Sequence, residues 1–196
     1  MTSTDKPRTR RRRDPEQRRD EVITAAEEVI TERGLAALTH RAVAEKSGVT
    51  LGSTTYYFKT LDDIVVAALQ RAVDRFTTYV TEFHDRSGFA DIEELIPALA
   101  DELVTSYTEH RNRTAMEFEL YTAAMRDAAL RPIAEQQMQV STATFARYTD
   151  QLTAETAAAF VSGLTVRAMT ATTPPSREQV IAMLERVLLP TRSSHT

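Results

Sequence analysis

The segment SGVTLGSTTYYFK, residues 47–59, concentrates small hydroxyl side chains and phenols in a short stretch. It also contains two of the five glycines of the chain, and the next acidic residue downstream is Asp62. Hydroxyl groups of Ser, Thr and Tyr bind phosphate oxygens and base edges, and the methyl group of Thr packs against that of thymine. A polyanion would repel acidic side chains. The composition therefore favours a contact with nucleic acid.

The residues in and around this segment predict two short helices joined by a tight turn. Thr39 is a suitable N-cap for HRAVAEKS, Gly48 ends this helix, and Thr50 is a suitable N-cap for a second helix over residues 51–58. Two such helices form a helix-turn-helix, whose second helix lies in the major groove of DNA. We expect contacts with DNA from Arg41, Thr50, Leu51, Gly52, Ser53, Thr54, Thr55, Tyr56, Tyr57 and Lys59.

The expected roles of these residues differ. Gly52 lets the helix approach a phosphate closely, the hydroxyls of residues 53–55 bind bases or phosphates, and Tyr56 and Tyr57 reach phosphate oxygens. The alternative interpretation is that Gly48 is an ordinary helix end and that the tyrosines are half-buried core residues of a helical protein without affinity for DNA.

The rest of the chain has helical periodicity. Asp14-Pro15-Glu16-Gln17 begins a helix that ends at Gly34, and Thr60 begins a long helix with an apolar stripe from Ile64 to Phe83. Further helices are expected at about residues 92–108, 113–126, 131–152, 154–171 and 177–189. No segment alternates with a period of two residues, so the predicted fold class is all-α, with about nine helices. The predicted units are a flexible basic arm (1–13), a helix-turn-helix domain (14–60), a long connecting helix (61–86) and a helical domain (87–196).

Residues 18–69 resemble the N-terminal domain of transcriptional regulators of the TetR family (TetR/AcrR type). The similarity is carried by AAEEVITERGLAALTHRAVAEKSGVTLGSTTYYFKTLDDIVVAAL, residues 25–69. Within it, Gly34-Leu35, the alanine-rich helix ending in SGV, then Gly52, YYF and an acidic pair before an aliphatic residue have the order and spacing of that family.

The resemblance implies an all-α homodimer whose third helix reads the major groove of double-stranded DNA. It also implies a C-terminal domain that binds a small-molecule effector, and a repressor that this effector releases from a palindromic operator. Three positions depart from the pattern, because Leu61 and Leu51 stand where the family often has Lys, and Thr55 stands where it often has Tyr. These departures put one phosphate contact at Leu61 in doubt and favour an apolar base contact at Leu51.

Two predictions concern the C-terminal domain. Residues 154–171 carry small residues that let two helices approach closely, and residues 177–189 are apolar on more than one face. The resemblance implies a homodimer formed through the last two helices, and these two segments suit that role better than packing within one subunit. Amphipathic and aromatic residues of the middle helices suit either a core or a ligand cavity. We expect Tyr107, Phe118, Glu119, Tyr121, Met125, Phe145 and Tyr148 to contribute to the ligand site.

The composition argues against other classes of function. Cys is absent, the four histidines are scattered, and no phosphate loop, dinucleotide fingerprint or nucleophile elbow occurs, so we expect no enzyme activity, no metal site and no cofactor. No run of about 18 apolar residues predicts a membrane span, and the arginine-rich N-terminus lacks the features of a secretory signal. The expected location is the cytoplasm. A helical scaffold that binds proteins through its acidic body remains the competing interpretation.

The charge is distributed unevenly. Residues 1–60 contain 12 Lys and Arg against 9 Asp and Glu, whereas residues 61–196 contain 12 against 19. Most of the positive excess lies in the first twenty residues, which favours a polyanion partner at that end only. The arginine run either reaches into a minor groove beside the helix-turn-helix or only raises non-specific affinity.

Overall fold

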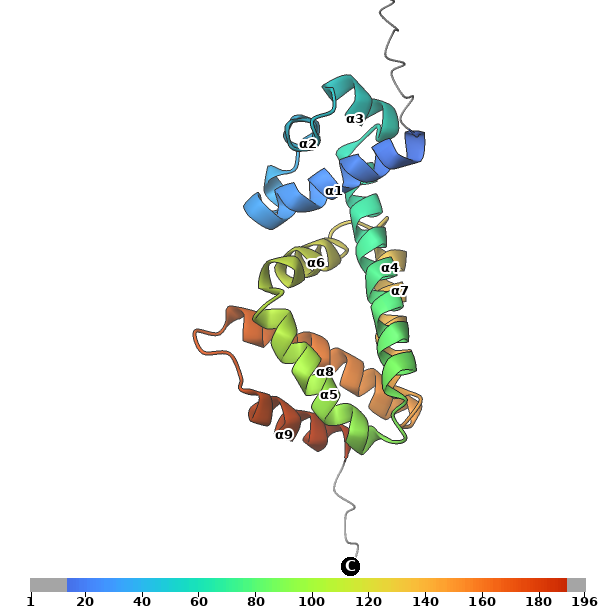
Figure 1. The fold of residues 1–196 in the computed structure, drawn as a ribbon, viewed down its shortest axis with the longest axis vertical. Helices are drawn as coiled ribbons and strands as arrows, with labels where there is room; N and C mark the ends of the chain where they lie inside the picture. The colour runs from blue at the N-terminus through green and yellow to red at the C-terminus, as the bar shows by residue number, and fades with distance from the viewer. Residues whose placement is uncertain (1–13, 190–196) are drawn as a thin grey trace, which may run out of the picture.

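The computed structural model describes residues 14–189, and this part of the chain is helical and contains no strand (Figure 1). The basic arm predicted for residues 1–13 lies outside the described residues. The helices are α1 (Pro15–Arg33), the 3-10 helix η1 (Leu35–Ala37), α2 (His40–Ser47), α3 (Leu51–Tyr57), α4 (Leu61–Ser87), α5 (Ile92–Tyr107), α6 (Arg111–Ala123), α7 (Arg131–Phe145), α8 (Gln151–Thr170) and α9 (Arg177–Leu188). The predicted all-α class is confirmed.

The first three helices, with η1, form a small unit that we call the head (residues 14–60). Its helices begin at the predicted caps, because the side chains of Asp14, Thr39 and Thr50 accept hydrogen bonds from the amides of Glu16, Ala42 and Ser53. Gly48 ends α2 in the left-handed conformation, with φ 68° and ψ 15°, which glycine adopts without steric cost. The chain therefore turns sharply between α2 and α3.

Helix α4 connects the head to the remaining helices. A capping box fixes its start: the amide of Asp63 donates to Thr60 Oγ1 at 3.1 Å, and the amide of Thr60 donates to Asp63 Oδ2 at 2.9 Å. With 27 residues the helix is about 40 Å long. Figure 1 shows α4 running from the head along α7 to the opposite end of the molecule.

Helix ends in the second half differ from the prediction at two places. The helix predicted over residues 113–126 is α6, Arg111–Ala123. We also predicted helices over residues 131–152 and 154–171, but α7 ends at Phe145 and α8 begins at Gln151. The reason is Asp150, whose carboxylate accepts hydrogen bonds from the amides of Leu152 and Thr153, both at 3.1 Å. An Asp N-cap ends one helix and starts the next, and this signal is present in the sequence.

Two apolar cores hold the molecule together, and their boundary does not follow that of the head. The first core contains residues of α1, α2 and α4, and also Met116 and Leu120 of α6. The second core joins α5, α8 and α9, which we call the body, with Phe145 at the end of α7. Helix α6 lies between the head and the body in Figure 1 and is packed into the core of the head.

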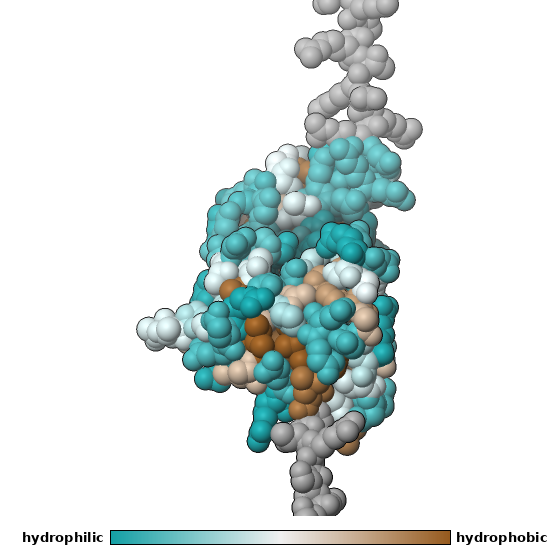
Figure 2. Space-filling model, turned by 60° about the horizontal axis from the view of Figure 1, so that its bottom comes forward, coloured by the Kyte–Doolittle hydropathy of each residue, from teal (hydrophilic) through white to brown (hydrophobic). Residues whose placement is uncertain are grey.

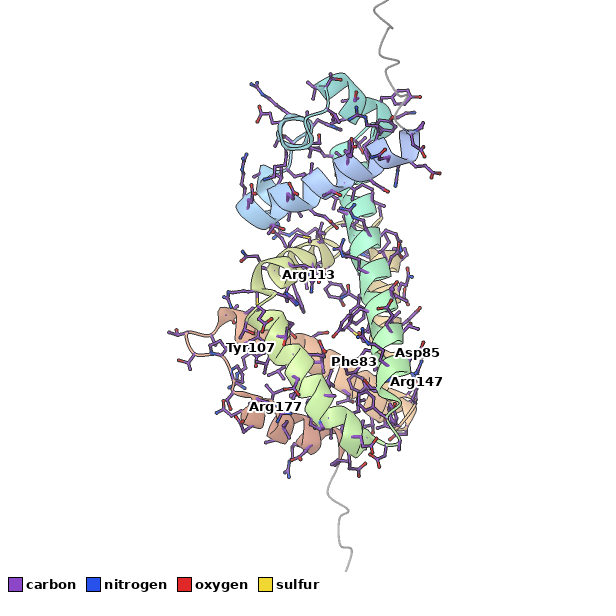
Figure 3. The ribbon with its side chains drawn as sticks, viewed as in Figure 1. Phe83, Asp85, Tyr107, Arg113, Arg147 and Arg177 are labelled. Carbon is purple, nitrogen blue, oxygen red and sulfur yellow. The ribbon has the colours of Figure 1, made fainter. Side chains whose placement is uncertain are left out.

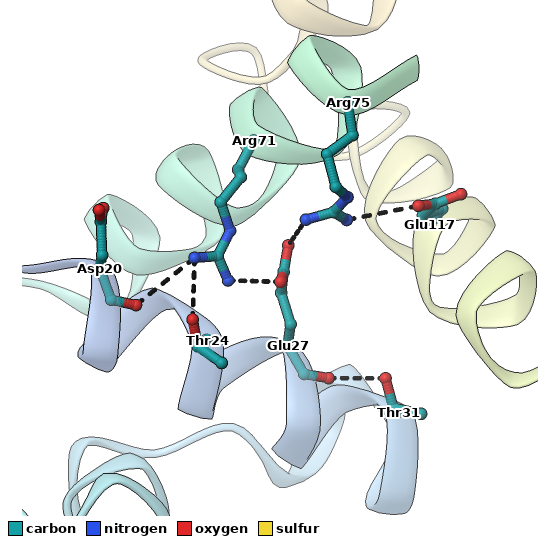
Figure 4. A network of polar contacts seen from close by, with 7 residues as sticks. All are labelled: Asp20, Thr24, Glu27, Thr31, Arg71, Arg75 and Glu117. Carbon is teal, nitrogen blue, oxygen red and sulfur yellow. Dashed lines mark hydrogen bonds and ion pairs between the residues drawn. The ribbon is translucent and has the colours of Figure 1, made fainter. Parts of the chain in front are cut away.

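A network of ion pairs links α1, α4 and α6 (Figure 4). Glu27 of α1 binds both Arg71 and Arg75 of α4, and Arg75 also lies 3.3 Å from Glu117 of α6. Burial raises the pKa of Glu117, although Arg75 acts in the opposite direction. The network therefore joins the head to α6 through a partly buried set of charges.

Candidate nucleic-acid interface and ligand site

Helix α3 presents one face to solvent. Leu51 is 51% exposed and Tyr56 is 79% exposed, and Gly52 and Thr55 are exposed beside them. The spacing 51, 52, 55 and 56 places these four residues on the same side of the helix. This face has the shape and the side chains that the helix-turn-helix prediction requires, with an apolar residue, a hydroxyl and a phenol around a glycine.

The opposite face of α3 packs inward, and one predicted contact is corrected by it. Thr54 is fully buried, and its hydroxyl donates to the carbonyl oxygen of Leu51 at 2.8 Å. Phe58, one turn later, is buried below the guanidinium group of Arg19. Thr54 therefore anchors the helix and has no surface to offer to DNA.

The remaining residues of the predicted interface lie around the exposed face. The hydroxyls of Thr50 and Ser53 are 2.9 Å apart at the start of the helix, and Tyr57 is half-buried with its ring edge-on to Tyr56. Arg41 and Lys59 are exposed, and Arg41 pairs with Glu45 of its own helix, at 3.2 Å. Exposed pairs of this kind contribute little stability, so Arg41 is free to exchange Glu45 for a phosphate.

The predicted ligand residues do not converge on one place. Phe118 and Tyr121 of α6 line a cavity that is completed by Gln137, Met138 and Ser141 of α7 and Ser162 of α8. Its accessible volume is only about 20 Å³, whereas sites for drug-sized ligands have volumes of roughly 300 to 1,000 Å³. The three helices therefore pack closely around the cavity, and it has no space for a ligand of that size. The α7 residues were not among the predicted set, because their types give no signal of a cavity.

Two of the predicted ligand residues are core residues. Tyr107 is 2% exposed and its hydroxyl donates to the carbonyl oxygen of Pro175 at 2.8 Å, at the junction of α5 with the loop before α9 (Figure 3). Phe145 is 3% exposed in the second core. Neither residue lines the cavity between α6, α7 and α8.

Three others have different surroundings. Met125 is 75% exposed in the loop after α6, and Glu119 accepts a hydrogen bond from the amide of Leu35 in the head. The hydroxyl of Tyr148 lies 3.4 Å from Nδ1 of His84, in an aromatic group that includes Phe83 (Figure 3) and Phe89. None of the three lines the cavity between α6, α7 and α8.

A larger hollow on the head has the wrong character for an apolar ligand. It lies along α1 and α2, has a volume of about 540 Å³, and opens widely to solvent. Half of its lining residues are acidic, namely Asp14, Glu16, Asp20, Glu21 and Glu28. Residues 14–189 contain no group of His, Asp and Glu side chains that could hold a metal ion, and no helix in this range is long and apolar enough to cross a membrane.

The structure contains a helix-turn-helix whose second helix is exposed and has no acidic residue. An all-helical body carries this motif. These features are those of a DNA-binding transcription regulator. The chain belongs to the TetR family. Residues 22–68 match the family described as bacterial regulatory proteins, tetR family, and residues 90–190 match the tetracyclin repressor-like C-terminal domain. The resemblance found in the sequence is thereby confirmed.

Solved structures agree with this assignment over most of the chain. The multidrug binding protein EbrR, in its complex with ethidium, is 37% identical, with a TM-score of 0.76, and the match covers 87% of this chain and 98% of that one. A TetR-family member from Streptomyces coelicolor A3, SCO1917, is 36% identical with the same TM-score and the same coverage.

A curated relative agrees over a shorter segment. The HTH-type transcriptional regulator PksA of Bacillus subtilis (strain 168) is 30% identical over 84 residues. These residues are 43% of this chain and 38% of PksA, so the match spans well under half of that protein.

Proposed function

We propose that the protein is a dimeric repressor that binds a palindromic operator through α3 and is released from it by a small aromatic molecule. The exposed face formed by Leu51, Gly52, Thr55 and Tyr56 is the observation that carries this proposal. Leu51 and Thr55 offer methyl groups to thymine, and Tyr56 offers a hydroxyl to a phosphate. Such a regulator works in the cytoplasm and needs no catalytic group.

The proposed dimer forms through α8 and α9. Leu152, Thr156, Ala159, Gly163, Val166 and Thr170 form an exposed stripe along α8, in which Leu152 is 72% and Val166 is 45% exposed. Small residues at its centre would let a second helix approach closely. Figure 2 shows apolar side chains gathered at the surface of the body. Ile181 and Val187 of α9 pack against the second core and stay partly exposed. Two copies would place their α3 helices about 34–36 Å apart, or a multiple of this, on successive major grooves.

The proposed effector site is the closed cavity between α6, α7 and α8. Phe118, Tyr121 and Met138 supply polarisable, largely apolar walls, and the hydroxyl and amide groups of the other lining residues could orient a ligand. Crystal structures of EbrR contain ethidium, proflavin or malachite green, which are aromatic dyes, and this supports an aromatic effector. Because the cavity is closed, the effector must bind an opened state more tightly in order to shift the equilibrium.

The decisive experiment is selection of random duplex DNA by the purified protein at two salt concentrations. We expect a palindrome to be enriched, and we expect malachite green, which unlike ethidium does not intercalate into the duplex, to lower the affinity for it. Salt-sensitive binding without an enriched sequence would mean that the arginines alone hold DNA, and would contradict the proposal. Absence of any affinity for duplex DNA would favour the protein-binding scaffold instead.

A further inference from the structure

Helix α6 is shared between the proposed effector site and the head. Phe118 and Tyr121 line the cavity, whereas Met116 and Leu120 are buried in the core of the head. A ligand that separates α6 from α7 and α8 must therefore also act on the contacts that α6 makes with the head. Which of these contacts transmits the movement decides how the protein responds.

One contact joins α6 to the head directly, without involving α4. Glu119 Oε1 accepts a hydrogen bond of 2.7 Å from the backbone amide of Leu35, which lies 84 residues earlier in the chain. Leu35 is the first residue of η1, and the first amides of a helix have no partner within the helix itself. No side chain of the preceding residues caps η1. Glu119 therefore supplies, from a distant helix, the cap that this turn lacks.

The conformation of Gly34 fits this arrangement closely. Its φ of 80° and ψ of 163° lie in a region that is essentially restricted to glycine. A Cβ atom at this position would also stand 3.4 Å from Glu119 Oε1. The turn is thus shaped so that the carboxylate reaches the amide of Leu35. The same turn leads within five residues to α2, so its position affects how α2 and α3 are held.

The ion-pair network is a separate connection. Glu117 lies two residues before Glu119, but it binds Arg75 and so reaches α1 only by way of α4 and Glu27. Glu119 reaches the turn between α1 and α2 directly. Substitutions at the two glutamates therefore test two different routes from the same helix.

We propose that Glu119 is a positioning residue that couples the effector cavity to the DNA-reading helices through the amide of Leu35. This rests on the function proposed above. When the cavity opens, α6 pulls the turn at Leu35 with it and displaces α2 and α3. Without Glu119, α6 moves while the head keeps its position, so the effector binds but no longer releases DNA.

The first test compares Glu119→Ala with Glu119→Gln, which keeps an oxygen acceptor, and with Thr122→Ala on the exposed side of the same helix. Binding of malachite green to the protein is measured without DNA, and the affinity for the selected operator is measured with and without this dye. For Glu119→Ala we expect unchanged dye binding and an effector response reduced about fivefold or more. Glu119→Gln and Thr122→Ala should respond like the wild type. A full response of Glu119→Ala would overturn the proposal.

A second test needs no ligand, because it opens the cavity with a side chain. Ser141→Leu places a larger, branched apolar side chain against Phe118 and Tyr121, and its thermal unfolding shows whether it folds. We expect Ser141→Leu to weaken operator binding and Ser141→Leu/Glu119→Ala to restore it. An equal loss in both variants, or no loss in Ser141→Leu, would contradict the coupling.

The two tests separate the failure of this proposal from the failure of the proposed function. If the wild type does not bind malachite green, the proposed effector class is wrong, but the Ser141→Leu pair still decides whether Glu119 couples the cavity to the head. If the wild type selects no operator, the repressor function fails first, and the role of Glu119 in releasing DNA fails with it.

Discussion

Two of the five glycines lie inside helices at places where the protein itself does not require them. Gly34, Gly48 and Gly88 have positive φ angles and end helices, whereas Gly52 and Gly163 do not. A Cβ atom would meet nothing closer than 4.0 Å at Gly52 and nothing within 4 Å at Gly163. Glycine inside a helix costs about 0.5–1 kcal/mol relative to alanine. The interfaces proposed above, with DNA at Gly52 and with a second copy at Gly163, would explain why this cost is tolerated.

Gly52→Ala should therefore change stability and binding in opposite directions. The added methyl group favours the helix and should raise the free energy of unfolding by about 0.5–1 kcal/mol. The same group projects from the exposed face of α3 and should lower the affinity for the operator about tenfold or more, since it separates the helix from the DNA backbone. Thermal unfolding and operator titration on one preparation measure both effects. Retention of full affinity would exclude a close contact at Gly52.

For single residues, the sequence predicts the local features of α3 better than it predicts the tertiary contacts of this helix. The hydroxyl-rich composition and the caps at Thr50 and Thr60 are local signals and are present in the structure. That Thr54 turns inward depends on how α3 packs against the rest of the head, so composition alone assigned it to the interface. The same limit applies in the body, because Tyr107, Phe145 and Tyr121 have equivalent helical spacing and only tertiary packing separates core from cavity.

Among the helices, the charges that join α1, α4 and α6 provide a test of their attachment. The side chain of Glu27 is 13% exposed and pairs with two arginines, Arg71 and Arg75. Glu27→Gln leaves these two positive charges close together without a common partner. We expect a loss of about 1–3 kcal/mol in the free energy of unfolding. Asp101→Asn is the matched control, because its pair with Arg177 joins exposed side chains and its removal should leave the unfolding temperature unchanged.

His84 lies where α4 meets the α7–α8 loop, and its surroundings predict that the stability of the protein depends on pH. Burial lowers the pKa of His84, which is 5% exposed, and Arg147 acts in the same direction while Asp85 opposes it. A histidine with a lowered pKa stays neutral in the folded protein, whereas the unfolded chain binds the proton near its ordinary pKa of about 6.5. Stability from this group is therefore complete above about pH 6.5 and is lost as the pH falls towards the folded-state pKa.

The measurement is the unfolding temperature of the wild type and of His84→Gln at pH 7.5 and pH 5.5. The wild type should lose more stability than the variant over this interval, because glutamine does not titrate. Parallel curves for the two proteins would show that His84 contributes no pH dependence.

Helix boundaries show why some elements were predictable and others shifted. Helices of the head begin at Asp14, Thr39 and Thr50, where a polar cap precedes an apolar pattern, and the structure has them there. The break between α7 and α8 was predicted after residue 152, several residues too late, because the N-cap at Asp150 was not recognised. Only the capping interactions of Asp150 with the amides of Leu152 and Thr153 determine where the new helix starts.

For the whole molecule, the proposed dimer depends on the stripe along α8. Gly163→Leu places a bulky side chain at its centre, where the single chain has open space. The fold should remain stable, because leucine is a good helix former, while close approach of a second copy is blocked. Sedimentation should show a monomer for Gly163→Leu and a dimer for both the wild type and Ala143→Leu, which alters an exposed position on α7. A dimeric Gly163→Leu would place the interface elsewhere.

The distribution of charge over the whole chain decides how the head is attracted to DNA. Residues 14–60 contain 6 Lys and Arg against 8 Asp and Glu, a net charge of −2, although α3 itself is free of acidic residues. Residues 1–13 contain 6 Lys and Arg against 1 Asp, a net charge of +5. The long-range attraction to a polyanion must therefore come mainly from these first residues, since the head without them would be repelled.

Replacing the six basic residues of this segment, Lys6, Arg8, Arg10, Arg11, Arg12 and Arg13, by Gln keeps its length and removes its charge. We expect weaker binding to every duplex, and a salt dependence that is shallower by about 0.9 for each phosphate that these side chains neutralise in the wild type. The ratio of operator to random-sequence affinity then separates the two roles that the sequence left open. A falling ratio indicates that the arginines read a minor groove beside the operator, and a constant ratio indicates that they only hold the backbone. Unchanged affinity and salt dependence would mean that α3 and its flanking residues overcome the negative charge of the head unaided.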